Sequence, residues 1–446
     1  MSRVPGDRRE DLYIVLIVGA VALVVVLLVI GFVVHGNHAC VSALQDFDAR
    51  VGSLDPAAYN LPSVPDEENA AHWFLEAARV LSLDQEDRAR LEDLILAGGE
   101  RSSKRHSAAP VAVFEKNSTA IRLAEKGGQR NRSTYGVDYA PGMSANLPNP
   151  GDQSKLQRLL LARGVSALER GDRSTVLSSV QAIGSLANAH EAELSFIFLL
   201  LGVSDERAQL SLVRSLLAPP DLDASTCRTL SGYLVSRDTG KVFVRALGFE
   251  GASYSELYRS LFSRKPETFV IVPWFFRHYT LSGVLRTLIM TADAFRKPYP
   301  EMLAYLNDNS RQLPFVQYRL GAEFLIDYHE IAGRVKRVMA ERRLAGFALA
   351  IREQALAGRP YSSNLSDIPG ADDPNPYSGT PLAANVRADG SLDLSFHMGE
   401  GAWKRACPGC DPEPAELEIV LPPTRRALTE PDERRVRHGL ERPRPE

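Results

Sequence analysis

Two cysteines near the C-terminus have the residue type and spacing best suited to chemistry in this chain. Cys407 and Cys410 enclose Pro-Gly in a Cys-x-x-Cys motif, which fits a redox pair, half of a zinc site or a disulfide. A thioredoxin-like centre needs a helix after the motif, and the Asp-Pro-Glu-Pro that follows does not begin one readily. We expect a structural disulfide that closes a small loop, with half a metal site as the alternative, and no bound cofactor.

The patterns of common catalytic centres do not occur in the sequence. His190-Glu191 and His329-Glu330 begin like His-Glu-x-x-His, but neither is followed by the second histidine. There is no Gly-x-Ser-x-Gly motif and no glycine-rich motif for a nucleotide. Asp327 shares a short helical stretch with His329 and Glu330, where a solvated or salt-bridged face is the simpler interpretation. We therefore predict no catalytic residues, with a hydrolase site assembled from distant residues as the alternative.

A long apolar segment near the N-terminus determines where the rest of the chain lies relative to a membrane. From Leu12 to Val34 the chain carries no charge, and this run is longer than the ~20 apolar residues that a helix needs to cross a bilayer. It is also longer than the apolar region of a signal peptide, and no Ala-x-Ala cleavage site follows. We predict an uncleaved transmembrane anchor in the lipid bilayer.

The distribution of arginines around the anchor predicts its orientation. Arg3, Arg8 and Arg9 precede the apolar run, whereas Arg50 is the first basic residue after it. Basic residues close to a membrane span tend to stay in the cytoplasm. We expect a single-pass protein of the bacterial inner membrane, with its N-terminus in the cytoplasm and its bulk in the periplasm.

Apolar residues spaced three to four positions apart predict helices through most of the remaining chain. The anchor helix is expected to continue to residue 51, because Val41, Leu44 and Phe47 keep this spacing. A turn at Gly171-Asp172 resembles half of a tetratricopeptide unit, although no 34-residue period recurs. The fold class predicted is mostly α, with a repeat-like ectodomain of helical hairpins. Further helices are expected over 66–83, 85–97, 152–218, in two pieces over 221–248, and over 315–356.

Three further segments allow more than one interpretation. The acidic stretch 46–93 and the basic stretch 100–132 are expected to pair across a hairpin, with a basic lipid-binding patch as the alternative. The apolar residues 269–276 are expected in the core, or on a membrane-facing or partner-facing patch. The loop 135–150 is functional or disordered. A basic face of the last long helix is expected to be solvated: Arg334, Lys336, Arg337, Arg342 and Arg343.

The pattern changes near the C-terminus. Residues 391–396 alternate between apolar and polar after an Asp389-Gly390 turn, which predicts a strand, and Glu416 to Leu421 predicts another. Few apolar residues follow, so 424–446 is expected to be a disordered tail. The predicted organisation is a cytoplasmic tail (1–11), the anchor (12–34), an N-terminal helical region (35–150), a helical core (151–357), a β element (358–423) and the disordered tail (424–446).

Parts of the chain resemble a loose group of uncharacterised bacterial single-pass membrane proteins. The resemblance rests on the segment from Arg342 to Ile351, on Asp373 to Leu382 (DPNPYSGTPL) and on Glu68-Asn69-Ala70-Ala71 after the anchor. It implies a helical ectodomain and a C-terminal tail similar to that of type II secretion pseudopilins. The calcium loop and the processing site of pseudopilins are missing, so only the architecture is carried over.

Charge and architecture together indicate a class of function. The chain holds 55 acidic against 52 basic residues, which argues against binding nucleic acid. We expect an extracytoplasmic scaffold or interaction protein of the bacterial cell envelope, with a protein partner in the envelope. A hydrolase and an accessory component of a secretion or pilus-like assembly are the alternatives.

Overall fold

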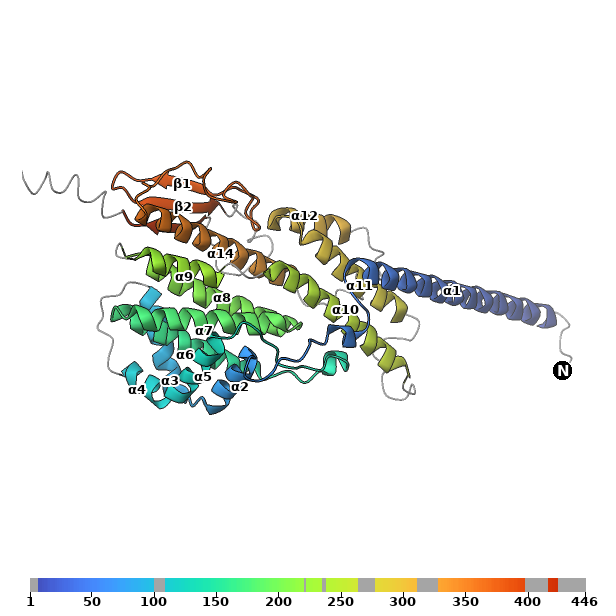
Figure 1. The fold of residues 1–446 in the computed structure, drawn as a ribbon. Helices are drawn as coiled ribbons and strands as arrows, with labels where there is room; N and C mark the ends of the chain where they lie inside the picture. The colour runs from blue at the N-terminus through green and yellow to red at the C-terminus, as the bar shows by residue number, and fades with distance from the viewer. Residues whose placement is uncertain are drawn as a thin grey trace, which may run out of the picture.

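The protein is mostly helical, as the sequence predicts, with one small sheet near its C-terminal end (Figure 1). The computed structural model describes residues 7–99, 109–219, 222–234, 238–263, 277–310, 328–397 and 416–423. The Cys-x-x-Cys motif, the apolar stretch 269–276 and the tail 424–446 lie outside the described residues.

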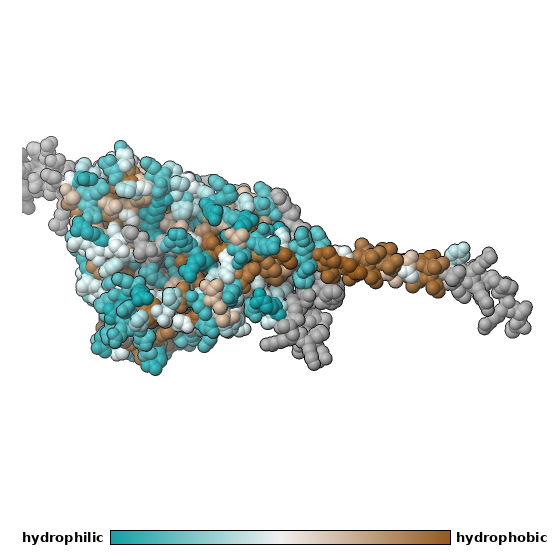
Figure 2. Space-filling model, turned by 45° about the vertical axis from the view of Figure 1, so that its right-hand side comes forward, coloured by the Kyte–Doolittle hydropathy of each residue, from teal (hydrophilic) through white to brown (hydrophobic). Residues whose placement is uncertain are grey.

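Helix α1 (Asp7–Arg50) is a single helix of 44 residues that leaves the body of the protein (Figure 1). Its apolar N-terminal half is exposed and stands out as a hydrophobic rod from a largely hydrophilic body (Figure 2). From Val15 onward the helix is long and apolar enough to cross a membrane. Its C-terminal half enters the core, where Ala43 and Phe47 are fully buried. The predicted continuation of the helix beyond the apolar run is confirmed.

The C-terminal half of α1 packs along α11 (Arg277–Ala294). A Cβ atom on Gly36 would lie 2.5 Å from the Tyr279 ring, so glycine permits this close approach. At the other end of the contact, Arg50 forms an ion pair with Asp293. The two helices are therefore joined over several turns.

The helical body consists of two interleaved rows of helices, with α14 at the top of the stack in Figure 1. One row contains α6 (Pro150–Glu169), α8 (Phe196–Leu217) and α14 (Tyr328–Leu356). The other row contains α5 (Ser118–Gly128), α7 (Arg173–Ala192) and α9 (Ala224–Leu234). Because α7 packs on both α6 and α8, successive helices alternate between the rows, as in helical hairpins.

Local capping explains where the helices of the body begin. Asn69 caps α2 (Ala70–Val80), and its side chain accepts a hydrogen bond from the Ala71 N–H. The helix therefore starts at Ala70 and not at Asp66 as the sequence suggested. The turn predicted before α7 is confirmed, with Gly171 at φ +70° and Asp172 as the N-cap.

The remaining helices surround this core. They are η1 (Pro56–Tyr59), α3 (Gln85–Gly99), α4 (Ala109–Lys116), η2 (Gly142–Ser144), α10 (Thr239–Ser263) and α12 (Tyr299–Ser310). Lys116 contacts Asp84 and Asp87, and Arg132 contacts Glu68, so the acidic and basic stretches do pair in part.

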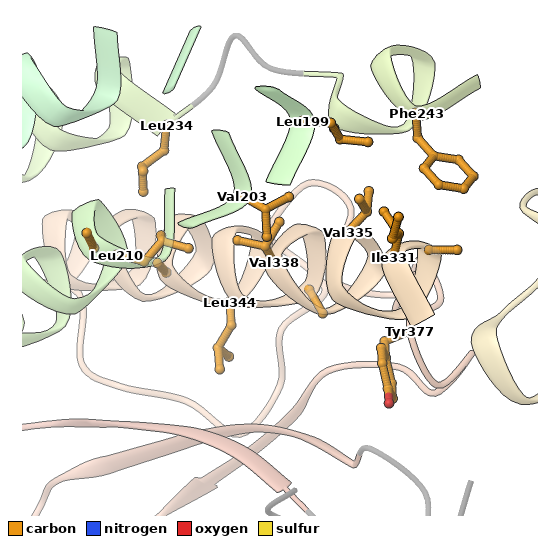
Figure 3. Packing of buried hydrophobic residues seen from close by; sticks show 14 of the residues in the cluster. Leu199, Val203, Leu210, Leu234, Phe243, Ile331, Val335, Val338, Leu344 and Tyr377 are labelled. Atoms are coloured by element: carbon orange, nitrogen blue, oxygen red, sulfur yellow. The ribbon is translucent and has the colours of Figure 1, made fainter. Parts of the chain in front are cut away.

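Helix α14 occupies the centre of the hydrophobic core (Figure 3). Its Val335 and Val338 are fully buried and lie toward Val203 of α8 (Figure 3). Leu344 points to the opposite side, toward the C-terminal sheet (Figure 3). The long helix thus joins the helical rows to the β element.

The sheet has the antiparallel order β1-β2-β3, formed by Ala383–Val386, Leu392–His397 and Glu416–Leu421. Leu392, Leu394 and Phe396 are fully buried, and the Phe396 ring lies 6.4 Å from that of Phe347 on α14. The two strands expected from the sequence are present. The third, β1, is too short and too exposed to show an alternating pattern.

Candidate functional site

The residues that sequence patterns singled out do not assemble into one site in the described part of the chain. Cys407 and Cys410 lie outside it, as does Asp327. Glu330 forms an i,i+4 ion pair with Arg334 at 2.6 Å, as expected for a salt-bridged helix face. Among the described residues, no three His, Cys, Asp or Glu side chains are grouped so that they could hold a metal ion.

The basic face of α14 is solvated only in part: Arg334 is exposed as predicted, whereas other residues of this face are buried or half-buried. Lys336 is 3% exposed, and its Nζ donates a hydrogen bond to the Phe295 carbonyl at 2.7 Å. Arg342 lies 3.0 Å from the fully buried Glu206, and Arg337 pairs with Glu341 at 2.9 Å. Arg342 therefore joins α14 to α8 and Lys336 joins it to the residue after α11, whereas the Arg337–Glu341 pair lies within α14 itself.

A histidine and an aspartate form a buried pair between α7 and α8. His190 Nδ1 lies 2.6 Å from Asp205 Oδ2, and Tyr135 stacks on the imidazole at 5.9 Å. His190 is completely buried, and its Nε2 has no hydrogen-bond partner. Because Asp205 is also buried, no substrate reaches this pair in the folded protein.

A second buried carboxylate fixes the loop 135–150. Glu193 accepts hydrogen bonds from the Tyr139 hydroxyl at 2.5 Å and from the Tyr135 N–H at 2.7 Å. Burial raises the pKa of Glu193 above its usual range, although these hydrogen bonds act in the opposite direction. Tyr139 is itself buried beside Phe249 of α10. The loop is therefore an ordered connection between the helical rows and α10.

A polar pocket of about 370 Å³ opens between the C-terminal end of α5, α7 and α9, with α8 beneath. Ser185 of α7 secures one wall, because its hydroxyl donates hydrogen bonds to the carbonyls of Gly127 and Arg130. The lining residues are Gly128, Arg130, Asn131, Gln181, Gly184, Ser185, Asn188, Gln209, Gly232 and Tyr233.

Gln209 forms the floor of this pocket from the row behind it. Its side chain is fully buried, and its Nε2 donates a hydrogen bond to the Val180 carbonyl at 3.1 Å. Its Oε1 has no hydrogen-bond partner. A buried acceptor without a partner costs about 1–3 kcal/mol of stability. Because Gln209 is fully buried, it closes the pocket without presenting this oxygen to the cavity.

Arg130 brings a positive charge to the rim. Its side chain is half-buried, its Nε has no hydrogen-bond partner, and no carboxylate among the described residues pairs with it. No Asp, Glu or His lines the pocket, and Tyr233 is its one titratable residue besides Arg130.

Sequence reasoning missed this pocket for a physical reason. Gln181, Ser185 and Asn188 lie on one face of α7, opposite the apolar face, which is the pattern of any solvated helix. Gln209 lies in α8 beside Leu210, Leu212 and Val213, which fill the core. A buried glutamine in such a helix is the one signal that could have pointed to a polar cavity.

Comparisons with known protein families, with curated proteins and with solved structures found no match.

Proposed function

We propose that this chain is a single-pass protein of the bacterial inner membrane whose helical body lies outside the cytoplasm and serves as a scaffold or interaction module of the cell envelope. The observation that supports this proposal best is the continuity of α1, which runs without a break from its exposed apolar half into the core. Its arginine-rich N-terminus favours the cytoplasmic side.

The contact between α1 and α11 also favours an anchor that is retained. Phe32 and His35 contact the ring of Tyr279, so the end of the apolar run belongs to the packed structure. A signal peptide that is removed would not need such contacts. The body is thereby held at a fixed angle to the anchor, which suits a protein that presents a binding surface near a membrane.

The hydrolase alternative receives no support from the described residues. The buried His190–Asp205 pair is closed to solvent, and the polar pocket is lined by amides, a guanidinium and a phenol. The resemblance to a pseudopilin tail remains a proposal for the β element, and no partner in a secretion assembly follows from it.

Reporter fusions test membrane topology. A reporter that works only outside the cytoplasm should be active when fused after Glu446, and a reporter that works only in the cytoplasm should be inactive there. Replacing Arg3, Arg8 and Arg9 by Asn, with three lysines inserted after Arg50, should reverse or mix this pattern. Activity of the cytoplasmic reporter on the unaltered chain would refute the orientation. Pull-down from solubilised membranes would then identify the partner.

A further inference from the structure

We propose that the polar pocket between α5, α7 and α9 binds a small acidic sugar, meaning a molecule with one carboxylate on a ring that carries several hydroxyl groups. This binding activity goes beyond the proposed role in the envelope and does not depend on membrane topology. Three features of the lining carry the proposal: a cation with no carboxylate partner among the described residues, a cluster of carboxamides, and an aromatic wall.

The guanidinium of Arg130 favours a ligand with a negative charge. Arg130 is the sole charged residue among those that line the pocket, so the lining balances one negative charge. A guanidinium presents parallel N–H donors that match the two oxygens of a carboxylate. In a half-buried position this interaction is screened less than at an open surface. A ligand with several phosphates would require more than one cation.

The carboxamides select for hydroxyl groups. Four of the lining residues carry a primary amide: Asn131, Gln181, Asn188 and Gln209. Each amide offers both donors and an acceptor, and a sugar hydroxyl likewise donates and accepts, so neighbouring hydroxyls can pair with several amides at once. Asn131, Gln181 and Asn188 are accessible to such a hydroxyl, whereas Gln209 is fully buried and closes the floor behind them.

The remaining walls suit the size and shape of a sugar ring. Tyr233 is partly buried against the core and provides an aromatic surface for the C–H groups of the ring. Beside it, a Cβ atom on Gly232 would meet nothing within 4 Å, so that wall is open. A volume of about 370 Å³ lies at the small end of ligand pockets, which suits a monosaccharide. A peptide would need apolar subsites that this lining lacks.

Isothermal titration of the full chain in detergent with D-glucuronate and D-glucose tests the proposal, because the two sugars differ by a carboxylate in place of a hydroxymethyl group. We expect saturable binding of glucuronate and at least tenfold weaker binding of glucose. Arg130→Gln should lower the affinity for glucuronate about tenfold or more, to that for glucose. Arg122→Gln, an exposed residue of α5 outside the pocket, should change neither.

A second variant tests the carboxamides of the pocket. Gln181→Leu, in the wall formed by α7, should weaken the binding of both sugars, and far-UV circular dichroism will show whether this variant is folded; if it is not, Arg130→Gln alone decides. Absence of saturable glucuronate binding to the folded protein would overturn the proposal. Equal binding of the two sugars, or unchanged glucuronate binding by Arg130→Gln, would also overturn it. Tighter binding of glycylglycine than of glucuronate would also overturn the proposal, because the pocket would then bind the carboxylate of a peptide and not a sugar.

Discussion

The ring of Tyr279 packs on that of Phe32 at a tilt of 32°, with 4.3 Å between the ring centroids, and its hydroxyl donates a hydrogen bond to the Phe32 carbonyl at 3.2 Å. Phe32 belongs to the apolar run of α1, whereas Tyr279 lies in the first turn of α11. Tyr279 is 4% exposed, so its ring and its hydroxyl both face the protein. The pair therefore joins the end of the apolar run to the first turn of α11.

Enlarging the glycine at this joint should separate the two helices. In Gly36→Val the new Cβ would lie 2.5 Å from the Tyr279 ring, so the ring or α11 must shift, and overpacking of this kind costs about 1–3 kcal/mol. Gly31→Val is the matched control, because a Cβ atom there meets nothing within 4 Å. Thermal unfolding of the full chain in detergent should show a lower midpoint for Gly36→Val and little change for Gly31→Val. Equal midpoints for the two variants would mean that the joint adds nothing to stability.

The hydrogen bonds that hold the loop 135–150 should contribute measurably to stability. Tyr139→Phe removes the donor to Glu193 Oε2 and the acceptor of the Leu194 N–H, which leaves two buried groups unpaired. We expect a loss of about 1–3 kcal/mol in the free energy of unfolding, measured by urea titration. In the control Tyr135→Phe, only a long contact of 3.4 Å to Gln153 is lost, and the backbone bond to Glu193 remains. Equal losses in the two variants would contradict the role assigned to Tyr139.

The sequence could predict those features whose residues lie within a few turns of one another. The continuation of α1 was predictable because Val41, Leu44 and Phe47 show the helical period within a few turns, and the turn before α7 was predictable from Gly171-Asp172 alone. The positions of Arg342 and Lys336 could not be predicted from the sequence. They depend on Glu206 and on the Phe295 carbonyl, which are distant in sequence.

The polar pocket was unpredictable for a related reason. Gln181 and Asn188 give α7 an ordinary polar face, and only the packing of α5 and α9 on either side makes this face the wall of a cavity. The contribution of Gln209 from the other row of helices depends on tertiary structure alone.

A half-buried acid on α10 should make stability depend on pH. Burial raises the pKa of Glu250 to about 7, and its neighbours Tyr254 and Tyr328 supply no positive charge that would lower it. In the unfolded chain the carboxyl titrates near its ordinary value of 4.5, so the folded protein holds the proton more tightly. The stabilising contribution is complete below pH 4.5 and is lost as the pH rises through 7.

Glu250→Gln should remove this dependence. The variant carries no charge at any pH, so its stability relative to the unaltered protein should increase between pH 4.5 and 7 and then stay constant, by on the order of 2–3 kcal/mol. Glu256→Gln serves as the control, because Glu256 forms a surface ion pair with Arg259 and should change stability little. Urea titrations at pH 4.5, 6 and 8 would measure both effects. A constant difference between Glu250→Gln and the unaltered protein across these three values would refute the assignment.

The four cysteines should separate into two classes when they are alkylated. Cys227 is fully buried, and burial raises the pKa of its thiol to about 11, so little reactive thiolate forms at neutral pH. Cys40 is 4% exposed in the contact between α1 and the body. We therefore expect neither thiol to react with iodoacetamide in the folded protein, and both to react once the chain is denatured without a reductant.

Cys407 and Cys410 should then react only after reduction, because two thiols at this spacing outside the cytoplasm are expected to be oxidised to a disulfide. Mass spectrometry would show two alkyl groups on the denatured, unreduced chain and four after reduction. In Cys407→Ser the remaining Cys410 should be alkylated in the folded protein, which provides the control for accessibility. Four alkyl groups without reduction would refute the disulfide. If these two thiols instead become reactive in the folded protein when a chelator is added, the motif is half of a zinc site. The prediction that the chain binds no metal would then be wrong as well.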